Sequence, residues 1–451
     1  MMVRVSAHRP LAGTVRVPGD KSISHRALLL ASLAEGRSVI RGLSDGADVR
    51  STMAAVGRLG VRVTTVAAWP RPLVTVESPG RAGLSEAADV IDAGNSGTTS
   101  RLFAGLVAGL PFTTLITGDA SLRERPMGRV TEPLTAMGAR ITGRHGGRLL
   151  PLAIEGGRLT AIDWALPVAS AQVKTSLVLA ALGADGSTRI TEPAPTRDHT
   201  ERLLPVFGGE LGRGATASTL VVPGGQTLRS AEVDVPGDPS SAAFFLVAAA
   251  AAPGAEVTVE GVGLNPGRVA FLDVLSAMGA DVEVRAAGKG YEPRGDVRVR
   301  PGRDGLKGVT IGAEKVPSLI DELPVLAVAA GMARGRTVID GAGELRHKES
   351  DRLAGTADLL RLMGAGVEVD GDRLTIDGLA AVTEGPAAEV VFDSRADHRL
   401  AMAAAIAACV TGRSLNIAGA DCVAISYPGF WRDLAALGAQ VVEGATLQAD
   451  E

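Results

Sequence analysis

One short pattern recurs six times along this 451-residue chain: a helix-like segment ends at a glycine, and a strand-like segment follows it directly. Glycine readily takes the left-handed conformation that ends a helix, and valine-rich runs favour strands. The recurrence, about every 70 to 85 residues, predicts six α/β units. The six copies are RLGVRV (58–63), AMGARI (136–141), VFGGEL (206–211), AMGADVEV (277–284), LMGAGVEV (362–369) and ALGAQVVE (436–443).

A longer repeat divides the six units into two groups of three. The segment TVRVPGDKSISHRALLLAS (14–32) is echoed by EVDVPGDPSSAAFFLVAAA (232–250). Each copy reads as a short strand, a Pro-Gly-Asp turn and a helix start that carries serine. We expect two related halves, with hinges at the turns near 18–20 and 235–238. A single long solenoid is the alternative, but solenoid repeats are usually shorter, about 20–45 residues.

Composition excludes several classes of protein. The net charge of −4 and the aromatic content of 3% argue against a nucleic-acid partner. Two cysteines supply neither a disulfide framework nor a set of metal ligands. The first ten residues show no signal-peptide pattern, and the longest apolar runs are too short to span a membrane. We therefore expect a cytoplasmic protein with no metal and no other cofactor.

Several expected helix starts carry cations, hydroxyls and amides. A helix start offers unpaired N–H groups and a partial positive charge, which suit an anion. Each start alone could be an ordinary cap with solvated charges, but their recurrence in both halves favours a site for anionic ligands. The helix-start segments are GDKSISHR (19–26), GNSGTTSR (94–101) and ASAQVK (169–174). RERPMGRV (123–130) adds two arginines before Pro126, in a segment that we expect to be extended or a turn.

Acidic and basic residues also meet in three later segments. Asp321 enters an apolar helix-like run, and RHKESDRL (346–353) places Lys348 and Arg352 four residues apart, which predicts one helical face. In DHRLAMA (397–403), the histidine has no partner at metal-ligand spacing and is interpreted as structural. The chain has no HExxH, G-x-S-x-G or nucleotide-binding motif. These residues allow acid–base chemistry on polyanionic substrates.

In chain order, seven motifs closely resemble the EPSP synthase family, the 3-phosphoshikimate 1-carboxyvinyltransferases. They are GDKSISHRALLLASLAEG, GNSGTTSRL, RERPMGRV, ASAQVKTSLVLA, DELPVLAVAA, RHKESDRL and DHRLAMA. The resemblance implies an α/β fold of two similar domains, each an inside-out barrel of three repeated α/β units, linked by a double crossover. It assigns residues 1–19 and 236–451 to one domain and residues 20–235 to the other.

The resemblance also implies roles for particular residues. Lys21, Ser22, Arg26, Ser170, Ala171, Gln172, Arg197, Asp321 and Lys348 would bind shikimate 3-phosphate. Lys21, Gly97, Arg125, Gln172, Arg352 and Arg399 would bind phosphoenolpyruvate. Asp321, Glu349 and Lys21 would be catalytic, and the sequence leaves open which of the three moves which proton.

The implied reaction transfers the enolpyruvyl group of phosphoenolpyruvate to the 5-hydroxyl of shikimate 3-phosphate and releases phosphate. Asp321 would take the hydroxyl proton. The resemblance further predicts a monomer. It also predicts inhibition by glyphosate, since Gly97 is not the alanine found in some glyphosate-tolerant members. Two departures are Ala171, where many members have a second serine, and Ile425, where some have a basic residue. The alternatives are enolpyruvyl transfer to UDP-N-acetylglucosamine and an inactive anion-binding homologue.

Overall fold

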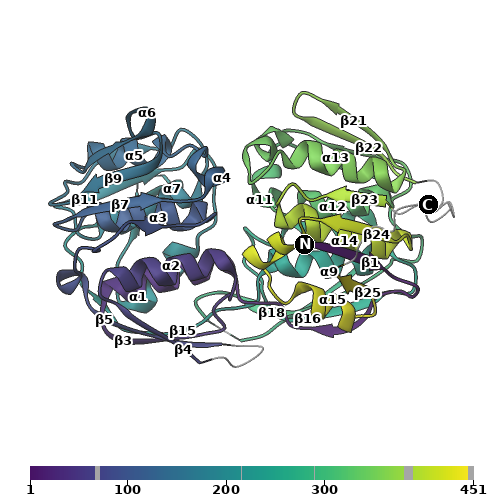
Figure 1. The fold of residues 1–451 in the computed structure, drawn as a ribbon, viewed down its shortest axis with the longest axis horizontal. Coiled ribbons are helices and arrows are strands. Elements are labelled where there is room, and N and C mark those ends of the chain that lie inside the picture. Colours follow the sequence, from purple (N-terminus) through teal and green to yellow (C-terminus); the bar gives the residue numbers. More distant parts are fainter. Residues whose placement is uncertain (67–71, 215, 289, 380–389, 445–451) are drawn as a thin grey trace. The chain divides into compact units, whose positions relative to one another are not determined.

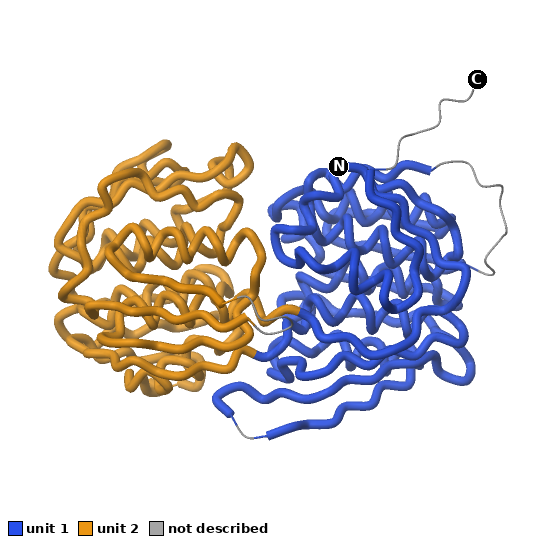
Figure 2. Tube along the Cα trace, turned by 60° about the horizontal axis from the view of Figure 1, so that its bottom comes forward, with its two compact units in different colours: residues 1–17, 236–451 blue, residues 18–235 orange. Residues whose placement is uncertain are grey.

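The computed structural model describes residues 1–66, 72–214, 216–288, 290–379 and 390–444. The chain divides into two compact units (Figure 2). Unit 1 comprises residues 1–17 and 236–451, and unit 2 comprises residues 18–235. The chain therefore passes from unit 1 to unit 2 at Val17 and back at Val235, beside the two Pro-Gly-Asp turns.

Six small sheets share one pairing pattern. In each sheet a parallel pair of strands is extended by two antiparallel strands. In unit 2 the sheets are, in strand order, β14 (Leu228–Arg229), β3 (Ala34–Arg41), β5 (Leu73–Pro79) and β4 (Arg62–Val66), with β15 (Glu232–Asp234) also paired to β3; β6 (Ile91–Asp92), β7 (Thr113–Thr117), β9 (Leu149–Glu155) and β8 (Arg140–Gly143); and β10 (Asp163–Ala165), β11 (Ser187–Thr191), β13 (Thr219–Pro223) and β12 (Gly212–Arg213).

Unit 1 repeats the same arrangement (Figure 1). Its sheets are β2 (Ala12–Val15), β16 (Glu256–Gly263), β18 (Arg294–Arg300) and β17 (Asp281–Ala286); β19 (Thr310–Ile311), β20 (Arg336–Ile339), β22 (Arg373–Asp377) and β21 (Gly366–Asp370); and β23 (Val390–Asp393), β24 (Leu415–Ala418), β1 (Met2–Ser6) and β25 (Gln440–Glu443). The N-terminal strand β1 lies between β24 and β25, antiparallel to both.

The six repeated glycines precede equivalent strands. All six have positive φ, between 76° and 119°, as the left-handed cap requires. The strand after each glycine lies at the edge of its sheet, namely β4, β8, β12, β17, β21 and β25. The prediction of six repeated α/β units is therefore confirmed.

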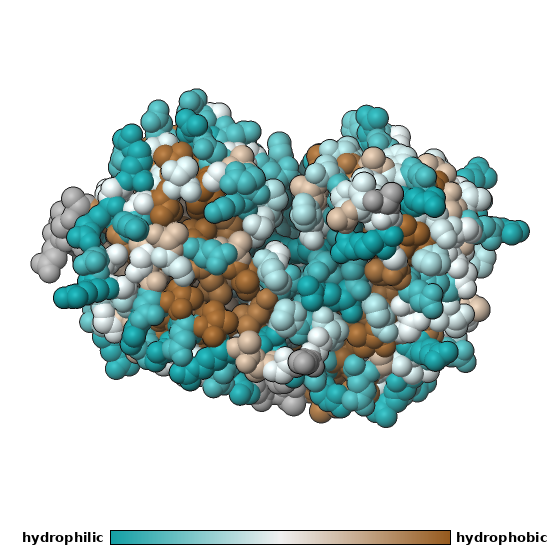
Figure 3. All heavy atoms as spheres, turned by 180° about the vertical axis from the view of Figure 1, so that it is seen from behind, coloured by the Kyte–Doolittle hydropathy of each residue, from teal (hydrophilic) through white to brown (hydrophobic). Residues whose placement is uncertain are grey.

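Each repeat contributes one inner helix that is buried on nearly every side. These helices are α1 (Lys21–Leu33), α3 (Gly97–Ala108) and α7 (Ala171–Ala181) in unit 2, and α9 (Pro239–Ala251), α12 (Leu323–Gly331) and α14 (His398–Thr411) in unit 1. Every residue of α9 and of α14 is buried. Hydrophilic side chains cover most of the face shown in Figure 3, with apolar residues in patches between them. Because the apolar helices lie inside and the sheets outside, the predicted inside-out α/β fold is confirmed.

The other helices connect these elements. They are α2 (Ala47–Arg58), α4 (Ala120–Arg123), α5 (Gly128–Ala136), α6 (Arg144–Gly147), α8 (His199–Leu203), α10 (Ala270–Met278), α11 (Val316–Leu319), α13 (Arg352–Met363) and α15 (Phe430–Ala436). Four 3₁₀ turns complete the described structure: η1 (Arg81–Gly83), η2 (Leu204–Phe207), η3 (Ala342–His347) and η4 (Ala420–Ile425). Among the described residues, no helix combines the length and the apolar character that a membrane span needs.

Candidate active site

The inner helices of unit 2 all begin at a capped start. Asp20, Ser96 and Ser170 each accept a hydrogen bond from a backbone N–H in the first turn of α1, α3 and α7. Such caps fix where a helix begins and leave its positive dipole end in place. The sequence-predicted residues Lys21, Ser22, Gly97, Ala171 and Gln172 lie at or just inside these starts.

Arg26 links the starts of α1 and α7 through hydrogen bonds. Its guanidinium is buried and donates from Nη1 to the Ser22 carbonyl at 2.9 Å and from Nη2 to the Ala171 carbonyl at 3.2 Å. Its Nε donates to Thr200 Oγ1 at 2.9 Å. Arg197 Nη1 lies 3.4 Å from Ser22 Oγ. The structure thus brings Ser22, Arg26, Ala171 and Arg197 together, as a site for one ligand requires.

Gln172 joins the α7 start to the α3 start. Its Oε1 accepts from Arg101 Nη1 at 2.8 Å, and its Nε2 donates to Thr98 Oγ1 at 2.9 Å. Sequence reasoning did not place Arg101 among the site residues, although its position one turn into α3 is a signal for it. The bridge fixes the Gln172 amide beside the Gly97 turn.

Arg125 and Gly97 lie near Arg101, the partner of Gln172. Asn95 holds the Arg125 guanidinium, accepting at 2.7 Å through Oδ1 and at 3.2 Å through its carbonyl. Arg125 Nε is buried and meets no acceptor among the described residues. A Cβ at Gly97 would lie 3.0 Å from Arg101 Nη1 and 3.6 Å from Arg125 Nη1. The missing side chain therefore lets an anion approach the backbone between two guanidinium groups.

Two lysines of unit 2 differ in their availability. Lys21 Nζ lies 2.9 Å from Asp48 Oδ2 and remains 16% exposed. Lys174, which also falls in a cationic helix-start segment, is buried against the carboxylates of Glu192 and Glu201. Of these two lysines, Lys21 thus remains the candidate for binding a ligand.

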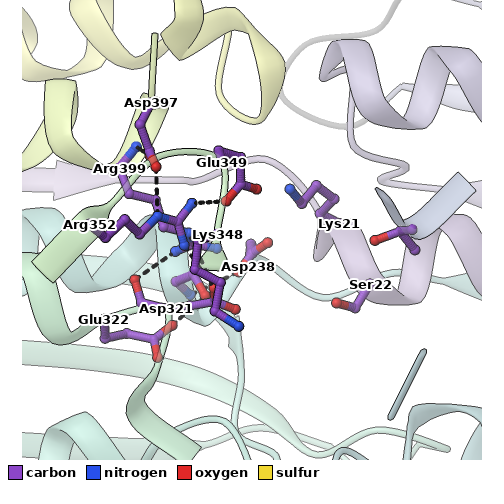
Figure 4. Close-up of polar contacts among 12 residues, drawn as sticks. Lys21, Ser22, Asp238, Asp321, Glu322, Lys348, Glu349, Arg352, Asp397 and Arg399 are labelled. Carbon is purple, nitrogen blue, oxygen red and sulfur yellow. Dashed lines mark hydrogen bonds and ion pairs between the residues drawn. The ribbon is translucent and has the colours of Figure 1, made fainter. Parts of the chain in front are cut away.

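Unit 1 carries a charged cluster centred on Arg352 (Figure 4). This guanidinium is 1% exposed and lies against Asp397 at 2.8 Å, Glu349 at 2.5 Å and Asp321 at 3.5 Å. Burial by itself lowers the pKa of Arg352, but attraction to Asp397, Glu349 and Asp321 outweighs burial and raises it above the ordinary value. The cluster therefore brings together residues far apart in sequence around a permanent positive charge.

Arg399 completes the cluster from the start of α14. Its Nη1 donates to the Asp321 carbonyl at 2.9 Å, and its Nε lies 3.4 Å from the Asp321 carboxylate. Asp397 caps α14 by accepting from the Arg399 N–H, and it also accepts from Ser350 Oγ at 3.1 Å. Sequence reasoning quoted Asp397 only as a helix-start residue, because its contact with Arg352 is not visible in a linear motif.

Lys348 lies outside the helix that the sequence predicted for it. Helix α13 begins only at Arg352, after its cap Asp351, and Lys348 has extended φ/ψ angles of −92° and −153°. The expectation of a shared helical face is wrong, because the Asp351 side chain accepts the Ala354 N–H and starts the helix there. Burial lowers the pKa of Lys348, against the attraction of Asp321 and Glu344.

Glu322 points into a different environment from its neighbour Asp321. It is buried and accepts a hydrogen bond from Ser240 Oγ, at the start of α9. Asp238, the cap of that helix, pairs with Arg268 at 3.0 Å. Only the first acid of the Asp-Glu pair therefore belongs to the Arg352 cluster.

Comparisons with known proteins identify the family of this chain. The family model described as EPSP synthase (3-phosphoshikimate 1-carboxyvinyltransferase) matches residues 5–434. A 3-phosphoshikimate 1-carboxyvinyltransferase of Pelotomaculum thermopropionicum is 48% identical over 431 residues, which cover 95% of this chain and 97% of the relative. One of a Synechococcus species is 52% identical and covers 95% of each chain. The solved EPSP synthase of Acinetobacter baumannii is 38% identical, with a TM-score of 0.85 over 98% of this chain and 100% of that chain.

Proposed function

This chain belongs to the EPSP synthase family, and we propose that it carries out the enolpyruvyl transfer of that family. The reaction moves the enolpyruvyl group of phosphoenolpyruvate onto the 5-hydroxyl of shikimate 3-phosphate and releases phosphate. One observation carries the proposal: ion pairs hold Asp321, Glu349 and Arg399 together in the Arg352 cluster. The family and the relatives favour this acceptor over UDP-N-acetylglucosamine.

The acceptor's phosphate is assigned to unit 2. Ser22, the Ser170–Gln172 start of α7 and Arg197 provide hydroxyl, amide and guanidinium donors within one small region. Arg26, which donates to the carbonyls of Ser22 and Ala171, orients both residues for that contact. Lys21 contributes a further positive charge to the same anion.

The binding of phosphoenolpyruvate is assigned to the residues that the family resemblance names for it. Arg125 and the Gly97 turn, with Gln172 beside them, supply one set of donors. Arg352 and Arg399 supply the other. Guanidinium groups suit this ligand because they pair with carboxylate and phosphate oxygens in a fixed geometry.

Proton transfer is assigned to Asp321, Glu349 and Lys21. Asp321 takes the proton of the acceptor hydroxyl, while Lys348 holds the hydroxyl groups in place. Glu349 and Lys21 serve the methylene carbon, which must gain a proton. Asp321 and Glu349 both lie against Arg352, so their carboxylates are fixed in direction before any substrate binds.

Three finer features belong to the same proposal. Glyphosate competes for the phosphoenolpyruvate contacts, and Gly97 leaves room for it. The chain acts as a monomer, and it acts in the cytoplasm. Sedimentation and an inhibition assay with phosphoenolpyruvate as the varied substrate test the first two of these features.

A phosphate-release assay tests the proposed function. The chain is expected to release phosphate from phosphoenolpyruvate only when shikimate 3-phosphate is added. UDP-N-acetylglucosamine in its place should give no release above background. Release with the nucleotide sugar alone would assign the chain to the other reaction, and no release with either acceptor would indicate an inactive homologue.

The pH dependence of acceptor binding tests Lys348. Burial disfavours the charged form, so the ammonium loses its proton below the ordinary lysine value of 10.5. The KM for shikimate 3-phosphate should therefore begin to rise at a lower pH than an exposed lysine would give. In Lys348→Arg the rise should move to higher pH, because arginine stays charged. Identical alkaline profiles of the two enzymes would remove Lys348 from the acceptor contact.

A further inference from the structure

Lys174 is buried between two acids and has no part in the proposed chemistry. Its side chain is 1% exposed, and Nζ lies 3.0 Å from Glu192 Oε2 and 2.5 Å from Glu201 Oε1. Both glutamates are nearly buried as well. One buried cation therefore pairs with two carboxylates, an arrangement that costs more desolvation free energy than apolar side chains filling the same space.

The two acids stand at the two ends of one loop. Glu192 follows β11, and Glu201 lies in α8, so residues 192–201 leave Lys174 and return to it. Thr196 Oγ1 donates to Glu192 Oε1 and closes the first part of the loop. Glu201 Oε2 is buried and meets no donor among the described residues, so Lys174 is the support of that carboxylate.

The middle of this loop carries Arg197. From there Arg197 Nη1 reaches Ser22 Oγ at 3.4 Å. Near the end of the loop, Thr200 Oγ1 accepts from Arg26 and shares a hydrogen bond with Thr175 Oγ1 at 2.7 Å. The loop is therefore held to α7 through Lys174 and Thr175. It is held to α1 through Arg26 and Ser22.

We propose that Lys174 is a positioning residue that holds both ends of the loop 192–201 and thereby places Arg197 for the acceptor's phosphate. The inference rests on the proposed function. The contact acts on the phosphate, since Arg197 lies beside Ser22, which is assigned to that group. Lys174 thus sets how strongly the enzyme prefers a phosphorylated acceptor to the same acceptor without phosphate.

A double-mutant cycle with two ligands tests this role. Calorimetry would give the Kd of shikimate 3-phosphate and of shikimate for the full chain, for Lys174→Met, for Arg197→Ala and for the double variant. Each single change is expected to weaken shikimate 3-phosphate binding about tenfold, and shikimate binding less than about threefold. The double variant should bind no more weakly than Arg197→Ala, because both changes remove the same contact.

Several outcomes overturn the inference. Losses that multiply in the double variant, to about a hundredfold, would show that Lys174 acts independently of Arg197. Equal losses for both ligands would show a general structural role. Failure of the unaltered chain to bind shikimate 3-phosphate would instead count against the proposed function.

A second variant and a control keep the test decisive. If Lys174→Met does not fold, the same cycle is run with Glu201→Gln, which keeps the Lys174–Glu192 pair, and the same two results are expected. If neither variant folds, Lys174 is structural and the inference fails. Arg189→Met serves as the control, because Arg189 on β11 forms an exposed pair with Asp163 at 3.4 Å. It should leave both Kd values unchanged.

Discussion

Replacing Asp321 with asparagine is expected to lower kcat by about 10²–10⁴-fold, the usual contribution of a general acid or base. The amide keeps the size of the side chain and can still accept from Arg399, but it cannot take a proton from the acceptor hydroxyl. Its contact with Arg399 weakens only in part, since the bond from Arg399 to the Asp321 carbonyl does not involve the side chain. Steady-state phosphate release would measure kcat, and calorimetry should show that shikimate 3-phosphate still binds.

A matched variant distinguishes loss of a base from loss of a charge. Asp340→Asn makes the same chemical change in unit 1, at a carboxylate paired with Arg373 at 2.6 Å on the surface. It should leave kcat unchanged. Glu349→Gln is expected to behave like Asp321→Asn, because Glu349 is the second acid of the cluster. Near-normal turnover in both site variants would refute the assignment of proton transfer.

The repeated architecture was predictable because its signals are local. A glycine with positive φ ends a helix within one turn, so Gly60 or Gly279 marks its boundary without help from the rest of the chain. The apolar run of α9 likewise predicts a buried helix on its own. The strand order was not predictable, because β1 pairs with strands more than 400 residues later in sequence. Such pairing depends on packing that no short window contains.

The candidate site shows the same division between local and long-range signals. The three helix starts of unit 2 could be predicted from their own segments, and the structure caps them with Asp20, Ser96 and Ser170. The Arg352 cluster could not, since Asp321 and Asp397 lie 31 and 45 residues away from Arg352 in sequence. A helix start and a buried ion pair can carry the same residue types, which is why only the structure separates Lys21 from Lys174.

Replacing Arg352 with methionine is expected to destabilise unit 1 by about 3–5 kcal/mol, the usual cost of removing one partner from a buried ion pair. Methionine fills much of the volume, but it leaves Asp397 fully buried without its cation, beside Glu349 and Asp321.

Amide hydrogen exchange in α13 and α14 measures the loss within unit 1, and so avoids treating a two-unit chain as a single transition. The control is Arg336→Met, which removes an equally short pair with Asp377 at 2.8 Å, but on the exposed surface. Because exposed ion pairs contribute little to stability, that variant should exchange almost as slowly as the unaltered chain. Equal protection in the two variants would mean that the three carboxylates do not depend on Arg352, and its place at the centre of the cluster would then be incidental.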